Sequence, residues 1–307
     1  MTELSREILR DWQVRKTKAQ KLRFIDFLQS RLPALTVEEG GLPRCRNLVL
    51  GDPESADMVF TAHYDTCARL PFPNFITPKN LLIYLAYQLL LLLPFFALAG
   101  LFCWGLIRLG VFPPGAVMLG WFAAFGLILY VFIFGPANPH TVHDNTSGVV
   151  TLCELSAALD EDERARCAFV FFDHEESGLF GSAVFRSRHK KAMKETLVVN
   201  FDCVSDGDHI LIVQNRLAKK RAGEALAQAF VSSADKQVCL AGPLGAFYPS
   251  DQVNFPFAVG VAAMNRSPIG LYMSRIHTAR DTVCDERNFS VLAEGARRLL
   301  RLYKEKE

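Results

Sequence analysis

Two adjacent glutamates follow an apolar stretch in the segment FFDHEESGLFGS, residues 171–182. The apolar residues predict a buried strand, so Glu175 and Glu176 come just after its carboxyl end. Carboxylates at such a place are costly to bury unless a cation, solvent or a neighbouring basic residue compensates their charge. The segment therefore indicates a site at which acidic side chains perform chemistry.

Other ionisable residues recur at comparable places along the chain. His63 and Asp65 end the strand-like segment VFTAHYD, and Asp202 ends LVVNFD. Two loop-like segments, HDNTSGV and RIHTARDT, contain Asp144 and His277. In sheets built from alternating strands and helices, ligands bind beyond the carboxyl ends of the strands. We therefore expect these side chains to collect around one site.

Each of these residues has an ordinary alternative when it is taken alone. His63 could be a core histidine, Asp144 the N-cap of a helix over 146–159, and His277 a surface loop residue. Together, two histidines and several carboxylates form a ligand set for a divalent cation, most naturally zinc. The sequence therefore predicts that a cation compensates the glutamate pair.

A site with two metal ions requires different roles of the acidic residues named above. It needs a carboxylate that reaches both ions. One of the adjacent glutamates can bind a metal while the other stays free to move a proton. Asp65, two residues after His63, is placed to orient the imidazole.

The motifs HYD, HDNTSG, EESGLFGS, NFD, YPSDQVNF and IHTARDT occur in this order. As a set they resemble the M28 family of zinc aminopeptidases, over residues 1–79 and 136–307. The resemblance implies a phosphorylase/hydrolase-like α/β fold with two co-catalytic zinc ions and peptide substrates that have a free N-terminus. It implies the following roles: His63 and Asp202 at one zinc, Glu176 and His277 at the other, Asp144 as the bridge, and Glu175 as the general base.

The sequence departs from the family pattern without losing a ligand. His174 stands where a glycine usually precedes the glutamate pair, and Gln252 stands where a histidine is usual. Tyr248 is an approximate counterpart of a tyrosine that assists the oxyanion in some members. These changes bear on substrate preference. Two alternatives stay open: a glutaminyl-cyclase-like acyltransferase of the same fold, and a membrane-tethered peptide-binding protein without catalysis, which has no need of Glu175.

The elements that position these residues alternate between strands and helices. Residues 1–32 and four later segments predict helices: 149–159, 183–193, 217–232 and 288–304. Strands are predicted at RNLVLGD, DMVFTAHYD, CAFVFFD, TLVVNFD, HILIV and FAVGVAAMN. This alternation predicts an α/β fold, with a mixed, mainly parallel sheet covered by helices on both faces.

An apolar segment interrupts the predicted peptidase domain at residues 80–135. Residues 81–107 and 115–135 contain no charged side chain, and each stretch exceeds the roughly 20 residues that cross a bilayer. The linker 108–114, with Arg108 and two prolines, predicts a tight turn. Two buried core helices are the alternative, but such helices rarely run so long without a charge. The segment therefore predicts a two-pass transmembrane hairpin that contacts the lipid bilayer.

Several features bear on the compartment and on the partners. Arg69 and Lys79 flank the spans on the domain side, which favours a cytoplasmic domain. The eight scattered cysteines and the charged N-terminal segment, without the apolar core of a secretory signal, agree with this orientation. A formal charge of +2 gives no basic footprint for nucleic acid. Short links between the predicted site and the spans favour apolar or membrane-derived peptides as substrates.

Overall fold

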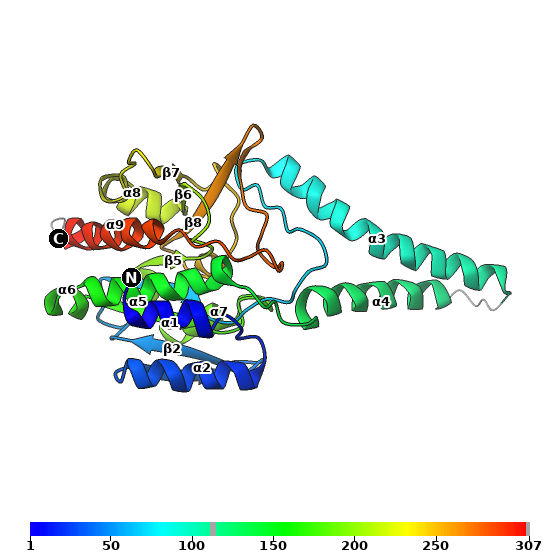
Figure 1. The fold of residues 1–307 in the computed structure, drawn as a ribbon, viewed down its shortest axis with the longest axis horizontal. Coiled ribbons are helices and arrows are strands. Elements are labelled where there is room, and N and C mark those ends of the chain that lie inside the picture. Colours follow the sequence, from blue (N-terminus) through cyan, green and yellow to red (C-terminus); the bar gives the residue numbers. More distant parts are fainter. Residues whose placement is uncertain (111–114, 305–307) are drawn as a thin grey trace.

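The computed structural model of the chain describes residues 1–110 and 115–304. Within these residues, nine strands form one mixed sheet at the centre of the main body (Figure 1). The strands are β1 (Thr36–Gly40), β2 (Cys45–Leu50), β3 (Met58–His63), β4 (Cys167–Phe172), β5 (Leu197–Phe201), β6 (His209–Gln214), β7 (Gln237–Ala241), β8 (Ala258–Ser267) and β9 (Gly270–Tyr272). Their order is β1-β2-β4-β3-β5-β8-β6-β7, and β9 pairs with β8.

The centre of the sheet is parallel. β4, β3, β5 and β8 lie side by side in the same direction. Antiparallel pairs join β2 to β4 and β6 to β8 on either side of this centre. The predicted mixed α/β sheet is thus confirmed, and its parallel part is the part that carries the site.

Helices and short helical turns connect the strands. They are α1 (Glu3–Asp11), α2 (Lys18–Arg31), α3 (Leu81–Arg108), α4 (Gly115–Leu129), η1 (Tyr130–Phe134), η2 (Val142–Thr146), α5 (Ser147–Ala158), α6 (Glu161–Ala165), α7 (Phe180–Arg188), η3 (Ala192–Lys194), α8 (Arg216–Ala229), η4 (Asp251–Asn254) and α9 (Glu286–Lys304).

Helices cover both faces of the sheet, because the central strands are apolar on both faces. Along β3, Met58 and Phe60 point into a core that also receives residues of α1, α2, α5, α8 and α9. Val59 points the other way, into a second core with α7 and η3. This alternation is the period-two pattern of a strand, and it confirms the predicted cover on both faces.

The N-terminal region, predicted to be helical over residues 1–32, consists of two helices. It forms α1 and α2, with a break between them. Thr17 begins α2 with a capping box: its side chain accepts the N–H of Gln20, whose side chain accepts the N–H of Thr17. Such a reciprocal cap marks the start of a new helix. In the view of Figure 1, α2 lies below the strands.

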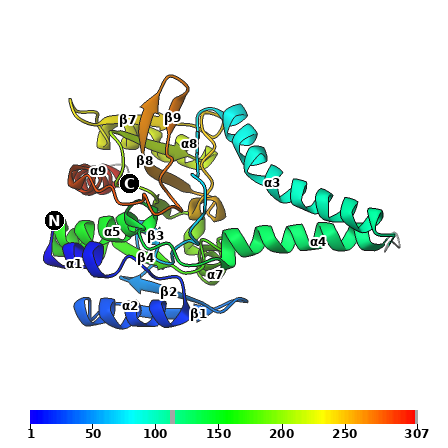
Figure 2. The same cartoon turned by 45° about the vertical axis from the view of Figure 1, so that its right-hand side comes forward.

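The apolar segment projects from the main body, and both chain termini lie at the opposite end (Figures 1 and 2). Within the described residues, α3 is the one helix long and apolar enough to cross a membrane, while the apolar helix over Met118–Phe134 is shorter. α3 and α4 pack together, with the Phe96 and Trp121 rings 5.4 Å apart. A side chain at Gly120 would collide with Cys103, so a small residue allows this close approach. Residues 111–114 of the predicted turn lie outside the described part of the chain.

Candidate active site

Three neighbouring strands bring acidic and histidine side chains to one edge of the sheet. His63 is the last residue of β3. Asp202 directly follows β5, and Glu175 and Glu176 follow β4. β4 and β5 flank β3 and run parallel to it, so their carboxyl ends meet at the same edge.

Asp144 lies between two histidines. Its Oδ1 is 3.3 Å from Nε2 of His63, and its Oδ2 is 3.0 Å from Nε2 of His277. His63 Nε2 is also 3.4 Å from Oδ1 of Asp202, and His277 Nε2 is 3.4 Å from Oε2 of Glu176. The side chains therefore form two groups that share Asp144, one around each histidine.

The turn η2 holds Asp144 by its backbone. The carboxylate of Asp281 accepts the N–H groups of His143 at 2.6 Å and Asp144 at 3.1 Å. α5 begins after Thr146, and no side chain caps it. The simple N-cap alternative for Asp144 is therefore wrong, because its carboxylate faces the two histidines.

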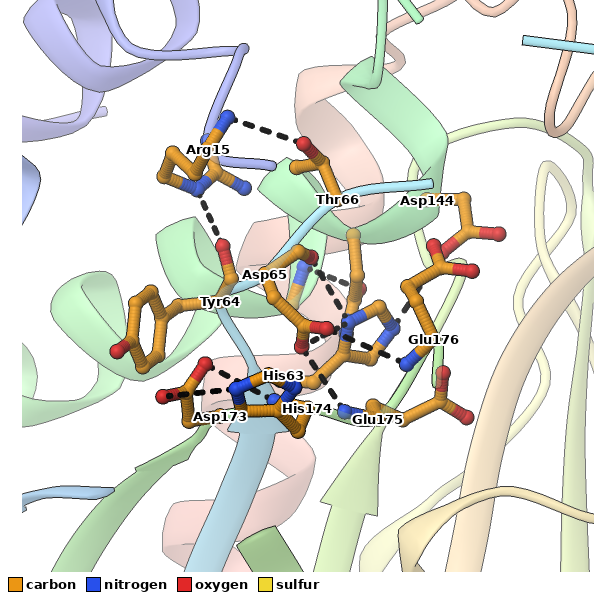
Figure 3. A network of polar contacts seen from close by, with 12 residues as sticks. Arg15, His63, Tyr64, Asp65, Thr66, Asp144, Asp173, His174, Glu175 and Glu176 are labelled. Carbon is orange, nitrogen blue, oxygen red and sulfur yellow. Dashed lines mark hydrogen bonds and ion pairs between the residues drawn. The ribbon is translucent and has the colours of Figure 1, made fainter. Parts of the chain in front are cut away.

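Asp65 organises the glutamate pair as well as the histidine (Figure 3). Its Oδ1 accepts the N–H of Glu175 at 3.0 Å, and its Oδ2 accepts the N–H of Glu176 at 3.3 Å. Its backbone carbonyl oxygen lies 3.1 Å from Nδ1 of His63, closer than the carboxylate at 3.6 Å. The sequence predicted the contact with the imidazole, but the contact with the glutamate turn could not be read from spacing.

A basic neighbour compensates only the first carboxylate of the segment that follows β4. The Lys21 ammonium lies 2.5 Å from Oδ1 of Asp173, and the N–H of Arg46 donates to Oδ2 at 3.0 Å. Within residues 1–110 and 115–304, neither Glu175 nor Glu176 forms an ion pair with lysine or arginine. The glutamate pair therefore needs another source of positive charge.

Burial shifts the pKa values of the acidic and histidine side chains at this site. It raises the pKa of Glu175 well above its ordinary value, although the charge of His63 opposes this shift. Burial and the charge of Asp144 likewise raise the pKa of Glu176, whose Oε1 is buried without a hydrogen-bond partner. Burial alone would lower the pKa of His277, but the surrounding carboxylates, first Asp144, raise it. The carboxylates thus depend on nearby positive charge.

The donor atoms of the site fit zinc. One ligand atom each from His63, Asp144 and Glu176 lie within 4.8 Å of one another, and the same holds for His63, Glu175 and Asp202. Imidazole nitrogens and carboxylate oxygens are common zinc donors. The buried unpaired oxygen of Glu176 is the kind of atom that a cation would satisfy.

Two cysteines that the sequence analysis did not assign also reach the site. Cys67 groups with Glu176 and His277, and Cys203 groups with Asp144 and Asp202, each set within 4.8 Å. Neither thiol belongs to a paired-cysteine motif. Only their positions in the sequence could have placed these cysteines at the site, because Cys67 lies four residues after His63 and Cys203 directly follows Asp202.

The residues that depart from the family pattern have a special backbone conformation or form hydrogen bonds near the site. His174 has a φ of 57°, a conformation that glycine adopts more easily. The side-chain amide of Gln252 donates to the carbonyl oxygen of Tyr248 at 2.6 Å and accepts from Asn200 at 3.0 Å. The Tyr248 hydroxyl donates to the carbonyl oxygen of Asp202 at 3.2 Å. Gln252 and Tyr248 thus brace the end of β5.

Solved structures share this architecture. The LapA aminopeptidase of Legionella pneumophila superposes with a TM-score of 0.56 at 13% identity, over 97% of this chain and 67% of LapA. Glutaminyl cyclase of Macrostomum lignano superposes with a TM-score of 0.59 at 13% identity, over 98% of this chain and 88% of the cyclase. At such low identity the likeness establishes the fold alone. No match was found among curated proteins.

The sequence also matches a family model, that of peptidase family M28, over residues 132–298. This match covers more than half of the chain. It includes both glutamates, Asp144, Asp202 and His277, while His63 precedes it on the neighbouring strand. With the α/β fold and the clustered histidines and carboxylates, the match shows that the chain belongs to peptidase family M28 and is of the hydrolase class.

Proposed function

We propose that the chain is a membrane-anchored aminopeptidase that uses two zinc ions to hydrolyse N-terminal peptide bonds. The observation that carries this proposal is the position of Asp144. One of its oxygens faces His63 and the other faces His277. A carboxylate shared in this way suits a two-metal site.

The side chains then have distinct roles. His63 and Asp202 would hold one zinc, Glu176 and His277 the other, and Asp144 would contact both. When bound, zinc supplies Lewis-acid polarisation of a carbonyl group and lowers the pKa of water.

Glu175 is the proton carrier of this proposal. Its carboxylate takes a proton from the attacking water and delivers it to the nitrogen of the leaving amine. Burial raises the pKa of Glu175, which favours its ability to hold the proton between the two transfers. Asp65 positions Glu175 by accepting its backbone N–H.

Two features distinguish this proposal from its alternatives. A cyclase with a single zinc lacks the full set of donors for two ions, whereas His63 and Asp144 are both present here and face each other. A binding protein without catalysis has no need of a half-buried, orientated glutamate at position 175. The glutaminyl cyclase fold neighbour keeps the first alternative in the test below.

We expect the detergent-solubilised protein to release the N-terminal residue from peptides with a free amine and to leave N-acetylated versions intact. A peptide library measured by mass spectrometry, with N-terminal glutamine included, tests this expectation. Cyclisation of the glutamine peptides without hydrolysis of the others would favour the cyclase. Cleavage of acetylated peptides at equal rates would exclude an aminopeptidase.

We further propose that residues 80–135 form a two-pass transmembrane hairpin inserted in the peptidase domain of residues 1–79 and 136–307. The outer surface of α3 and α4 supports this, because large apolar side chains are exposed along both helices, among them Leu82, Leu101 and Phe122. Exposed apolar surface of this extent is costly in water and is normal in lipid. The peptidase domain is proposed to be cytoplasmic.

The base of the hairpin lies beside the proposed metal centre. A cavity of about 140 Å³ is lined by Ile133 and Phe134 together with Glu176 and His174. The Lys16 ammonium donates to the carbonyl oxygen of Ile133 at the same cavity. Substrates that reach Glu176 from this side would pass Ile133 and Phe134, where η1 joins the main body, so the proposal favours apolar or membrane-derived peptides.

The hairpin should resist extraction from membranes by alkaline carbonate, because lipid covers its apolar surface. Sidedness can be read from Cys284, which is exposed. In sealed cells, a membrane-impermeant maleimide should label it only after permeabilisation, and a Cys284→Ser variant is the control. Glycosylation is unsuited to this test. The sequence has glycosylation sequons at residues 145–147 and 288–290, but their asparagines, Asn145 and Asn288, are fully buried. Release by carbonate, or labelling of intact cells, would contradict the proposal.

A further inference from the structure

Each of the two groups of zinc donors has a buried thiol beside it, but the two thiols differ in their surroundings. Cys203 directs its S–H to Oδ1 of Asp202 at 3.2 Å. Cys67 lies with Glu176 and His277, with one donor atom of each within 4.8 Å of the others. Cys67 therefore lies close enough to Glu176 and His277 to share a metal ion with them.

The backbone fixes Cys67 in this position from both sides. Its carbonyl oxygen accepts the N–H of Asn138, at 3.2 Å, from the segment that leaves the hairpin. Three residues later, the N–H of Leu70 donates to the carbonyl oxygen of His277 at 2.7 Å. The segment that carries the thiol is thus hydrogen-bonded to the loop that carries the histidine.

We propose that the Cys67 thiolate is a fourth protein donor at the His277 position of the metal centre, beside Asp144 and Glu176. This inference rests on the metal centre proposed above. It makes the two positions unequal, because the donors proposed for the His63 position are His63, Asp144 and Asp202, while the S–H of Cys203 is directed to the carboxylate of Asp202. Four protein donors are typical of tightly held zinc, whereas three leave a place for water or substrate.

The proposal has a consequence for metal choice. A thiolate is a soft ligand that favours zinc, cobalt and cadmium over magnesium or manganese, whereas carboxylates favour the harder ions. The His277 position should therefore select the softer ions and fill first. The His63 position should be the one that exchanges its metal readily.

Cobalt tests the proposal because its absorption spectrum reports a sulfur ligand independently of activity. The full-length protein in detergent, stripped of metal and kept reduced, is titrated with Co²⁺ alone. We expect visible bands from both positions and a near-ultraviolet thiolate-to-cobalt charge-transfer band that grows with the first equivalent. Cys67→Ser should abolish the charge-transfer band, keep visible bands, and weaken the tighter site by at least about tenfold.

Cys203→Ser is the matched control, since it removes the other buried thiol of the centre and should keep the charge-transfer band. The proposal is overturned if the wild type shows visible cobalt bands without the charge-transfer band, or if that band survives in Cys67→Ser. Binding of no cobalt at all would reject the metal centre itself, which is a different result.

A second measurement needs no variant. In ¹¹³Cd NMR of the wild-type protein, one resonance should lie in the downfield range of sulfur ligation and one in the range of nitrogen and oxygen donors. Two resonances in the nitrogen and oxygen range would contradict the assignment of Cys67, even if the serine variant fails to fold.

Discussion

Replacing Glu175 by glutamine is expected to lower turnover by about 10²–10⁴-fold while leaving the zinc content unchanged. The glutamine keeps the shape of the side chain and the backbone N–H that Asp65 accepts, but it cannot take a proton from water. The measurement pairs the rate of hydrolysis of a free-amine peptide with zinc analysis of the same preparation.

Glu176→Gln is the matched control for this prediction. The two glutamates are adjacent, and both N–H groups bind Asp65, but only Glu176 lies at His277. This variant should lose zinc as well as turnover. Equal zinc contents in the two variants would contradict the division of roles between the glutamates.

Asp144→Asn is expected to have the largest effect on metal binding. One carboxylate oxygen faces each histidine, and asparagine can offer only one oxygen. Zinc should fall to one equivalent per chain or fewer, and the affinity for the second ion should fall by more than the roughly 10–100-fold that removal of an outer hydrogen-bond partner costs. Zinc titration by calorimetry measures this loss.

Asp281→Asn is the control in the same loop. Asp281 is also buried, but it accepts backbone N–H groups of η2, so its loss should weaken zinc binding only through the position of Asp144. A variant of Asp144 that keeps two equivalents with unchanged affinity, or one that behaves no worse than Asp281→Asn, would show that the carboxylate is not shared between two ions.

The sequence predicted the residues at the strand ends, because runs of apolar residues indicate buried strands. His63, Asp202 and the glutamate pair all follow apolar runs, and parallel strands had to bring them to one edge. Asp144 and His277 lie outside regular strands, so the sequence predicted only that they join the same ligand set, and their individual roles came from the resemblance. The shared position of Asp144 depends on the path of η2, which the hydrogen bonds to Asp281 fix across 137 residues of sequence.

Other features had no local signal. β1 and β7 lie at the edges of the sheet and escaped prediction. In β1, Glu38 and Glu39 interrupt the apolar alternation of a buried strand. The ion pair of Lys21 with Asp173 joins residues 152 positions apart. This lysine compensates the charge of Asp173 but not that of the glutamate pair. No role for Cys67 could be read from the sequence, because the role proposed for it depends on the loop of His277, more than two hundred residues later.

The number of zinc ions bound per chain tests the proposed two-metal site most directly. Elemental analysis of the purified full-length protein, combined with peptide hydrolysis before and after chelation, measures it. We expect close to two zinc equivalents per chain, loss of activity on chelation, and recovery when zinc is restored. A preparation that stays fully active after exhaustive chelation would contradict the account.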